Sequence, residues 1–527
     1  MNNSTTGVEE DVPWPTEPLA YIEEPDTDDD TNAGAGHGDV SDSVLADLAA
    51  SSVLRGRWRW CVGLGWLQWD GQRWAVRDDV LVSEVVRQFL AAQFGKKVEE
   101  QGANLNPKRL QELQALLSAS KVRNVTTLAR GIDGISTLAD QLDANPDLLN
   151  TPSGVVDLRT GKLSRHNPEL LMTKLTQGSY IPDHTHRDWE TALEALPKPE
   201  REWFQTRAGQ AVTGHTNPDG ILVLMQGGGE NGKSLLSTDG LVPALGDYAD
   251  VASAKLLSTT NEHSEEMATL RGKRFLVSEE MTEGRALNIA AIKRIQDVGT
   301  ITARHVYKSN MTFKATHALF ATTNYLPVVN ETDHGTWRRL ALLVFPYTFR
   351  KPGEELRHED ERHGDPRLKA RIKANRSGQY DAIVTWVVEG AMRWYANPDT
   401  ALAVTDQVAK DTRNWRAEAD RILGYWDECL IAEPAACVIT TELHAAFNEW
   451  LASNGHNAWP KELFHPRFKS HTETSRHGVV EARPKTLPEG LARHGLDKFD
   501  TPPVSKRPVI YKGVRYRTDT DASDQQE

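Results

Sequence analysis

The segment Ile221 to Leu236, which reads ILVLMQGGGENGKSLL, constrains the fold of this chain more than any other. Its first five residues are apolar without polar alternation, which predicts a short buried strand. The residues from Gly227 to Ser234 then match the phosphate-loop pattern G-x-x-x-x-G-K-[ST]. A strand before the loop and a helix expected to begin near Lys233 disfavour a chance glycine-rich turn. The pattern therefore predicts an α/β fold that binds a nucleotide.

Each residue type in this loop suits phosphate chemistry. Glycines let the backbone turn tightly and direct its N–H groups at phosphate oxygens. The Lys233 ammonium can reach the β- and γ-phosphates, and the Ser234 hydroxyl can ligate Mg²⁺. We therefore predict a site for ATP and Mg²⁺. Its nucleotide-binding residues follow one another along the loop and into the helix: Gly227, Gly228, Gly229, Glu230, Asn231, Gly232, Lys233, Ser234 and Leu235.

A second strand is expected to end in two carboxylates. The run from Phe275 to Ser278 leads directly into Glu279 and Glu280, downstream of the loop. Two acids in this position can supply one ligand for Mg²⁺, for which we expect Glu279, and one group that polarises the attacking water. Which of the two acids is catalytic stays open at this point.

A third strand, Ala318 to Thr323, ends at Asn324. An amide there can hydrogen-bond the γ-phosphate or the attacking water, although a lone asparagine is also a common turn former. Arg338 and Arg339 directly precede a further buried strand. One of these arginines can point across a subunit boundary at a neighbour's phosphates and stabilise the charge of the transition state.

The order of these motifs resembles that of superfamily 3 helicases, and most of all the phage and plasmid primase-helicases grouped with poxvirus primase-helicases. The segments QWDGQRW, LLNTPSGVVDLRTGKL and TTNYLPVVNETDHGTWRRLALLVFPYTF add to the likeness, which covers roughly residues 60 to 350. The resemblance implies an AAA+ core that assembles as a ring, expected to be a hexamer, and moves 3′ to 5′ on DNA. It implies these roles: Walker A for Lys233 and Ser234, Walker B for Glu279 and Glu280, sensor 1 for Asn324, and an arginine finger for Arg339, with Arg338 as second choice.

The resemblance also implies a hairpin that grips DNA in the pore of the ring. Tyr307 and Lys308 would lie near its tip, with Arg304 in the same stretch. The family commonly has Gly-Gly-Asp before Ile-Thr-Ala-Arg, whereas this chain has Asp-Val-Gly-Thr at 297–300, and that departure affects the placement of the hairpin.

A second departure concerns the primase domain that many relatives carry ahead of the helicase. No D-x-D motif in a strand context precedes the loop in this chain. We therefore expect no primase activity from the chain itself. A separate primase or polymerase is the partner that this expectation implies.

The charge of the chain is distributed unevenly. The net charge is −13, yet residues 1–50 alone hold 13 acidic side chains and no Lys or Arg. Those acids account for the whole net charge, so the remainder is neutral overall and can carry basic surfaces. Residues 1–45 are rich in Asp, Thr, Gly and Pro and cannot bury a core. We expect a disordered acidic tail that solubilises the chain, with partner binding or mimicry of nucleic acid as the alternative.

Several classes of protein are disfavoured. The chain has no run of 18 apolar residues and no secretory leader at its N-terminus, so neither a transmembrane helix nor secretion is expected. Cys61, Cys429 and Cys437 form no C-x-x-C pair, so a zinc site or a disulfide framework is not supported. We expect a cytoplasmic protein of a bacterial host cell without a membrane partner.

Changes of composition divide the chain into six predicted segments. They are a disordered acidic tail (1–45), an α+β N-terminal domain for assembly (46–190), the superfamily 3 AAA+ ATPase (191–350), a helical lid or linker (351–420), a winged-helix-like DNA-binding domain (421–518) and a disordered end (519–527). Five tryptophans crowd into residues 58–74, where Asp70-Gly71 predicts a hairpin turn. They could stack bases, but a role in the core or at a domain interface is favoured.

The C-terminal part contains three patterns. Residues 350–375 are highly charged and are expected to be a solvated linker and helix, while residues 418–455 are expected to be helical. The segment Lys461 to Arg517 has 13 Lys or Arg against 6 Asp or Glu and is expected to end in two strands joined by a turn at Lys512-Gly513. Helices followed by a basic hairpin suggest a winged helix that touches DNA phosphates. The alternative is a structural cap with a solvated basic face.

Together these patterns predict an ATP-driven ring helicase that unwinds duplex DNA in the replication of a phage or mobile element. Its expected partners are single-stranded or forked DNA and further copies of the chain. Two other classes remain open: a P-loop DNA translocase, and a replication-initiator or remodelling factor that hydrolyses ATP without unwinding. Strand displacement on forked DNA discriminates among these classes.

Overall fold

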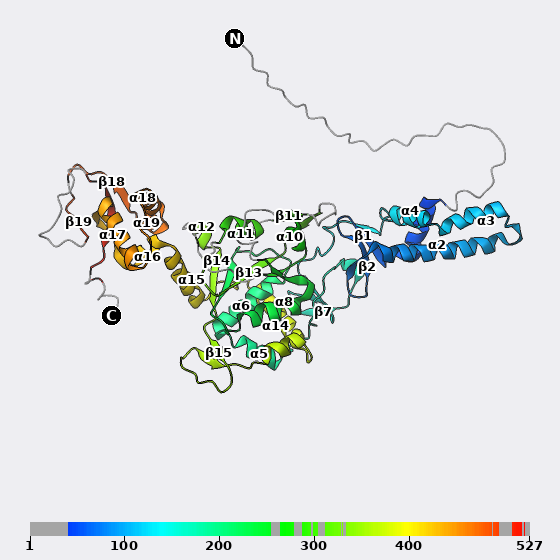
Figure 1. Ribbon diagram of the computed structural model, residues 1–527, viewed down its shortest axis with the longest axis horizontal. Coiled ribbons are helices and arrows are strands. Elements are labelled where there is room, and N and C mark those ends of the chain that lie inside the picture. Colours follow the sequence, from blue (N-terminus) through cyan, green and yellow to red (C-terminus); the bar gives the residue numbers. More distant parts are fainter. Residues whose placement is uncertain are drawn as a thin grey trace, which may run out of the picture.

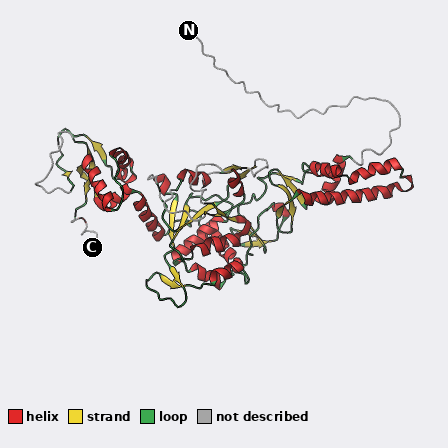
Figure 2. Ribbon diagram, in the orientation of Figure 1, coloured by secondary structure: helices red, strands yellow, loops and turns green. Residues whose placement is uncertain are grey.

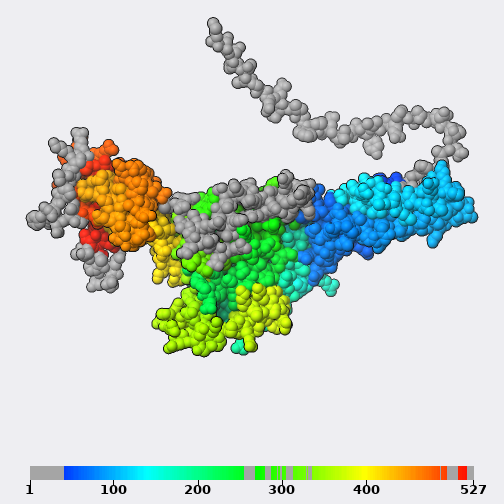
Figure 3. Space-filling view, in the orientation of Figure 1, coloured from blue at the N-terminus to red at the C-terminus, as the bar shows by residue number. Residues whose placement is uncertain are grey.

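The computed structural model describes residues 41–253, 264–278, 287–296, 299–303, 311–327, 329, 334–486, 488–494, 508–518 and 521. A helical arm on the N-terminal side and a small domain on the C-terminal side project from opposite ends of a central α/β body (Figure 1, Figure 3). Within these ranges, no helix is both long and apolar enough to span a bilayer.

The N-terminal part combines a small sheet with the helical arm. Its elements are α1 (Asp42–Ala49), β1 (Trp58–Cys61), β2 (Gly65–Trp69), β3 (Trp74–Arg77), α2 (Asp79–Gln101), α3 (Pro107–Gln114), α4 (Ala119–Ala129) and β4 (Ser136–Thr137), with the strands in the order β3-β2-β1-β4. The predicted hairpin turn is confirmed: Trp69 pairs with Trp74, and Asp70 Oδ1 accepts the N–H groups of Gln72 and Arg73. Gly71 supplies the positive φ of 99° that the turn requires.

Three tryptophans of the row lie in the core. Trp58, Trp66 and Trp74 are at most 3% exposed. Trp58 and Trp66 pack with α1, α2 and α4, and their rings meet edge to face at 6.4 Å. The interpretation as core residues is therefore confirmed for these three.

A three-stranded meander links the arm to the central body. It consists of β5 (Leu148–Thr151), β6 (Gly154–Asp157) and β7 (Lys162–Ser164). Leu149 and Val156 are fully buried in the same hydrophobic cluster as the central sheet. The meander thus shares a core with the residues that follow it.

The central sheet has five strands, which all run parallel in the order β14-β8-β13-β10-β9. They are β8 (Leu222–Gln226), β9 (Ala249–Ala252), β10 (Phe275–Ser278), β13 (Ala318–Thr323) and β14 (Leu340–Val344). Their near-continuous apolar sequences suit a sheet that is covered on both faces. The predicted α/β architecture is confirmed by this sheet.

Helices cover the two faces of the sheet (Figure 1, Figure 2). One face packs on α5 (Arg187–Leu193), α6 (Lys198–Ala211), α8 (Val242–Leu245) and α14 (Gln379–Ala396), and the other on α10 (Ser264–Thr269), α11 (Ile289–Gln296), α12 (His334–Trp337) and α15 (Asp406–Ala419). Alternation along β8 explains both contacts: Val223 and Met225 enter the first core, whereas Leu222 and Leu224 enter the second.

The charged segment after β14 forms ordered structure against the body. It contains β15 (Thr348–Arg350), β16 (Glu361–His363) and α13 (Leu368–Ala374), and the two strands pair in parallel. Leu368 and Ile372 of α13 reach the first core, as do most apolar residues of α14. This core therefore contains residues from the segments predicted as 46–190, 191–350 and 351–420.

The C-terminal domain is a four-stranded sheet of order β18-β20-β17-β19 packed with helices. Its elements are α16 (Arg421–Cys429), β17 (Leu430–Ile439), α17 (Thr440–Ser453), α18 (Lys461–Ser470), α19 (Thr472–Arg476), β18 (Val480–Ala482), β19 (Leu491–Ala492) and β20 (Ile510–Tyr516). The expectation that residues 418–455 are helical is confirmed at α16 and α17 and is wrong at β17, which separates them.

The predicted turn at Lys512-Gly513 is also wrong. Both residues lie within the single strand β20. Gly513 has a φ of 93° and stands opposite a register shift in β17, between Ala432 and Cys437. The glycine therefore accommodates a bulge in the partner strand and does not reverse the chain.

Candidate nucleotide site

The loop after β8 holds Lys233 in a buried, fully bonded position. Lys233 Nζ donates to Gly227 O at 3.1 Å, to Thr323 O at 3.1 Å and to Asn324 Oδ1 at 2.6 Å. The side chain is only 5% exposed. Because β8 and β13 are parallel neighbours, their carboxyl ends meet at one edge of the sheet, and this brings Lys233 and Asn324 together.

Two glycines of the loop make close approaches that a side chain would prevent. A Cβ on Gly227 would lie 1.8 Å from Asn231 Nδ2 and 3.1 Å from Phe345 O. Gly232 has a φ of 84°, and a Cβ there would lie 2.7 Å from Ala195 Cβ. Gly228 and Gly229 are exposed and have open space where a Cβ would be. The loop thus has a tightly packed base and an open crest.

Asn231 is the buried amide of the loop. It is 5% exposed, and its Oδ1 accepts the backbone N–H of Lys233 at 3.3 Å. Its Nδ2 is buried and meets no acceptor in the described part of the chain. A buried donor without an acceptor is costly, so this atom is available to an oxygen of a bound anion.

A cavity of about 450 Å³ opens beside the loop. Its walls come from the loop itself, from α5, from β15 and β16, and from α13. The residues that line it include Thr191, Ala195, Glu230, Asn231, Gly232, Ser234, Leu235, Phe349, Arg350, His363, Pro366, Leu368 and Lys369. Ser234 is exposed at this surface. A space of this size can hold a small organic ligand.

The charged segment 350–375, expected from its sequence to be solvated, forms one wall of this cavity. Arg350 pairs with Glu361 at 2.7 Å, and this pair joins β15 to β16. The backbone N–H of Arg357 and the Arg350 guanidinium lower the pKa of Glu361 to about 2. In the sequence, only the place of this segment, directly after the last strand of the central sheet, indicates that it could line the cavity.

The two predicted finger arginines differ in their surroundings. Arg338 is exposed, whereas Arg339 is half-buried and its Nη1 donates to Gly335 O at 2.8 Å. Both precede β14, so they lie at the amino edge of the parallel sheet, opposite to the loop at its carboxyl edge. Five residues of strand separate these edges by about 15 Å. The two arginines are therefore too far from the phosphate loop of their own chain to reach a nucleotide bound there.

Five residues predicted for the site lie outside the described ranges: Glu279, Glu280, Arg304, Tyr307 and Lys308. The strand before the acids is β10, as predicted, and it ends at Ser278 on the same edge as Lys233 and Asn324. The predicted hairpin strands are β11 (Thr300–Ala303) and β12 (Met311–Lys314), which pair antiparallel. Among the described residues, no group of three or more His, Cys, Asp or Glu could hold a metal ion.

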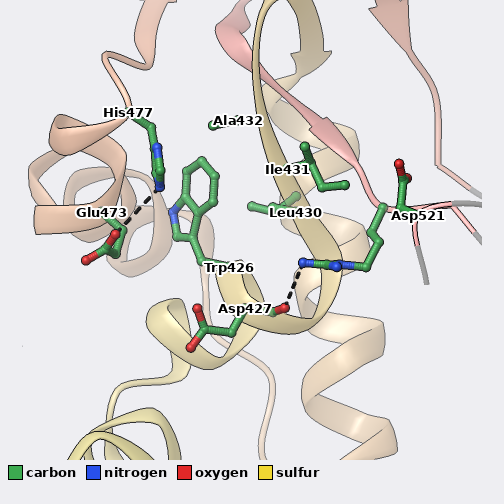
Figure 4. Close-up of a pocket in the computed structure, with 9 residues that line it drawn as sticks. Trp426, Asp427, Leu430, Ile431, Ala432, Glu473, His477 and Asp521 are labelled. Atoms are coloured by element: carbon green, nitrogen blue, oxygen red, sulfur yellow. Dashed lines mark hydrogen bonds and ion pairs between the residues drawn. The ribbon is translucent and has the colours of Figure 1, made fainter. Parts of the chain in front are cut away.

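A second cavity, of about 560 Å³, lies in the C-terminal domain (Figure 4). Figure 4 shows His477 directed at Glu473, which is 3.6 Å away, and Arg517 Nη2 donates to Asp427 O at 3.1 Å. The lining also includes Asp521, so three carboxylates face one arginine and one histidine. This balance of charge does not suit a phosphate group.

Basic side chains gather instead on α18 and α19. Lys461, Lys469 and Arg476 expose 71%, 64% and 72% of their side chains. Arg467, on the same helix as the two lysines, lies over the ring of Trp459 at 5.3 Å. Each of the three exposed cations also lies near a carboxylate: Lys461 near Glu462, Lys469 near Glu481 and Arg476 near Glu473.

Three protein-family descriptions match successive parts of the chain. They are "D5 N terminal like" over residues 44–197, a family of unknown function (DUF5906) over residues 225–339, and "Poxvirus D5 protein-like" over residues 417–494. A protein of African swine fever virus whose name describes a primase is 26% identical over 330 residues, which are 59% of this chain and 34% of that protein. The chain resembles D5-like primase-helicases.

Two other relatives carry the name of a helicase. One, from Acanthamoeba polyphaga mimivirus, is 28% identical over 55% of this chain and 32% of its own length. Another, from Frog virus 3, is 24% identical over 48% of this chain and 26% of its own length. The chain thus spans about a third of the length of the curated relatives it matches. These relatives come from viruses of eukaryotes and lend no support to the expected bacterial host.

Among solved structures, the apo form of the NrS-1 C-terminal region covers 67% of this chain and 88% of its own. The identity is 11% and the TM-score is 0.38. This likeness is too low to bear on the fold or the function.

Proposed function

We propose that this chain is an ATP-driven DNA helicase with a superfamily 3 AAA+ core, which acts in DNA replication. The observation that carries the proposal is the contact, at the carboxyl edge of the central sheet, between Lys233 of the glycine-rich loop and Asn324 after β13. Relatives named as primases and helicases support a role in replication. Unwinding, its 3′-to-5′ direction and the absence of primase activity are parts of the proposal.

The loop residues fit the phosphates of ATP. The open crest at Gly228 and Gly229 leaves backbone N–H groups accessible, and the buried Asn231 Nδ2 adds a donor. Lys233 would exchange one of its three present acceptors for a phosphate oxygen. The cavity beside the loop has room for the base and ribose. Ser234, exposed beside this cavity, and Glu279 would hold Mg²⁺, which neutralises charge on the phosphates. Glu280 or Glu279 would orient the attacking water, and Asn324 would hydrogen-bond it or the γ-phosphate.

The position of the arginines supports a ring of subunits. Arg338 and Arg339 lie at the edge of the sheet opposite to their own loop. A second copy that presents its loop to this edge would receive an arginine at its phosphates. Repetition of such a head-to-tail contact closes a ring, and we propose a hexamer.

Two parts of the chain are proposed to touch DNA. The hairpin β11–β12 would enter the pore of the ring with Arg304, Tyr307 and Lys308. In the C-terminal domain, we interpret α16, β17, α17 and α18, followed by β18 and β20, as a winged helix. The exposed cations of α18 and α19 suit contacts with phosphates.

Strand displacement on forked DNA tests this proposal. The full chain with ATP and Mg²⁺ should separate a labelled fork, and forks with only a 3′ or only a 5′ tail report direction. Lys233→Ala should unwind nothing, because the phosphates lose a buried cation. ATP hydrolysis without displacement on any fork would favour the alternative of a translocase or a remodelling factor.

A further inference from the structure

We propose that Trp415 is a positioning residue that couples the nucleotide site to the C-terminal domain. The inference rests on the proposed function, since it concerns how ATP turnover at the loop reaches DNA. It is carried by one helix, α15, which extends from the central body to the C-terminal domain (Figure 1). Its buried contacts lie in the C-terminal half, at Trp415, and at the C-cap, Asp420.

Trp415 touches two segments of the candidate site at once. Its Nε1–H donates to Pro327 O at 3.1 Å, three residues after Asn324. Its ring meets that of Trp337 edge to face at a distance of 5.0 Å, directly before Arg338. Trp415 is 1% exposed and Trp337 5%. The Trp415 indole therefore contacts both the loop after Asn324, the candidate sensor, and the turn before Arg338, a candidate arginine finger.

The helix is also bonded to the edge of the sheet. Thr412 Oγ1 accepts the backbone N–H of Leu342 at 2.9 Å and donates to Val408 O at 2.7 Å. Leu342 lies in β14, the edge strand next to the strand that precedes the phosphate loop. Movement of β14 or of its preceding turn would therefore displace α15.

The far end of α15 is tied into the C-terminal domain at Asp420. Its Oδ1 accepts the N–H groups of Ile422 and Leu423 at the start of α16. Its Oδ2 lies 2.8 Å from Nε2 of His471, and both side chains are completely buried. His471 Nδ1 in turn accepts the N–H of Glu473 at the start of α19. One carboxylate thus joins α15 to two helices, one of which carries exposed cations.

Three buried side chains, Trp415, Asp420 and His471, mark the route from the loop after Asn324 to α19, and the last turn of α15 joins the first two. Buried, close-packed groups shift between discrete arrangements and transmit strain. A change at the candidate sensor or finger should therefore alter the pose of the basic helices, and DNA bound there should alter ATP turnover in return.

The experiment compares Trp415→Phe with the full wild-type chain. Phenylalanine keeps a ring against Trp337 but removes the N–H that Pro327 accepts. Trp74→Phe is the matched control, because it removes a buried indole N–H bond to the carbonyl of another proline, Pro168, in the N-terminal part of the chain, away from this route. The measurements are kcat and KM for ATP with and without single-stranded DNA, and the DNA affinity in ATP and in ADP.

Wild type and Trp74→Phe should show DNA-stimulated turnover and a DNA affinity that depends on the nucleotide. Trp415→Phe should keep KM within about twofold and lose about fivefold or more of the stimulation, the low end of typical coupling. His471→Gln, on the far side of the route, should lose a comparable part of the stimulation with unchanged basal turnover. It keeps the proposal testable if Trp415→Phe fails to fold.

Three results would overturn the inference. Equal stimulation in wild type and in the folded variants would leave the proposed function standing and remove the coupling. Basal and stimulated turnover that fall in the same proportion would reduce Trp415 to a local structural residue. Wild type that hydrolyses no ATP would overturn the proposed function, and this inference with it.

Discussion

At the scale of residues, the site is built around the ammonium of Lys233. It donates to the carbonyls of Gly227 and Thr323 and to the side-chain amide oxygen of Asn324. Gly227 follows β8, whereas Thr323 ends β13 and Asn324 follows it. The sequence predicted both Lys233 and Asn324 from their places after buried strands. That Asn324 bonds the lysine itself could not be predicted, because the contact depends on β8 and β13 being neighbours in the sheet.

Asn324→Ala tests the role of this amide. If it positions the attacking water, kcat for ATP hydrolysis should fall by about 10²-fold while KM changes little. Asn217→Ala is the control, since it removes an amide that bonds Ile221 O before the same sheet. Steady-state hydrolysis measures both variants. An unchanged kcat in Asn324→Ala would return this residue to the role of a turn former.

His317 makes the stability of the body depend on pH. It is fully buried, its Nε2–H donates to Ile295 O at 3.0 Å, and burial lowers its pKa from 6.5 to about 4. Between these values the unfolded chain binds a proton that the folded chain does not. This group therefore makes stability fall as the pH drops from 6.5 to 4, with a slope of at most about 1.4 kcal/mol per pH unit.

Denaturant unfolding at several pH values measures this effect. Wild type should lose more stability than His317→Gln between pH 6.5 and pH 4. The difference between the two curves isolates this histidine from the carboxylates that also titrate in acid. Parallel curves would show that His317 binds its proton as readily in the fold as in the unfolded chain.

At the scale of elements, the packed base of the phosphate loop limits its sequence. Gly227→Ala places a Cβ 1.8 Å from Asn231 Nδ2, so Asn231 must move and its bond to the Lys233 N–H is lost. We expect a cost of about 1–3 kcal/mol in the free energy of unfolding, together with weaker ATP binding. Gly228→Ala is the control, because nothing lies within 4 Å of its added Cβ.

Denaturant unfolding and titration with a fluorescent ATP analogue measure the pair. If Gly227→Ala and Gly228→Ala have the same free energy of unfolding and the same affinity for the ATP analogue, the packing at the base of the loop does not shape the site.

Elements with continuous apolar sequences were predicted well, and others were not. The strands around the loop and the Asp70-Gly71 hairpin follow from local patterns. Strand β17 was missed because its sequence, LIAEPAACVI, contains Pro434 and several alanines, which do not favour a strand locally. It is a strand because β20 and β19 pair with it. The wall formed by β15, β16 and α13 was not predicted, because its charged residues pair with residues far away in the sequence. Arg371, for example, pairs with Asp188.

At the scale of the whole molecule, the proposed site needs a second copy of the chain to supply its arginine. Arg338 and Arg339 lie at the edge of the sheet away from their own loop. Alanine in place of the arginine that acts as the finger, Arg338 or Arg339, should lower kcat by on the order of 10³-fold. Alanine in place of the other arginine should lower kcat far less. The exposure of Arg338 suits a finger, and the bond of Arg339 to Gly335 O suits a residue that holds the turn.

Mixing experiments identify the finger. An inactive Lys233→Ala chain still carries both arginines, so it should restore turnover when mixed with the finger variant. If Lys233→Ala restores ATP turnover neither to Arg338→Ala nor to Arg339→Ala, a neighbouring subunit does not supply the arginine.

The most direct test of the central claim is ATP hydrolysis by the full chain with and without single-stranded DNA, beside a sizing measurement with nucleotide bound. We predict turnover that DNA stimulates, in an assembly of ring size, and no turnover in Lys233→Ala. Hydrolysis that DNA leaves unchanged, in a chain that stays monomeric, would contradict the account.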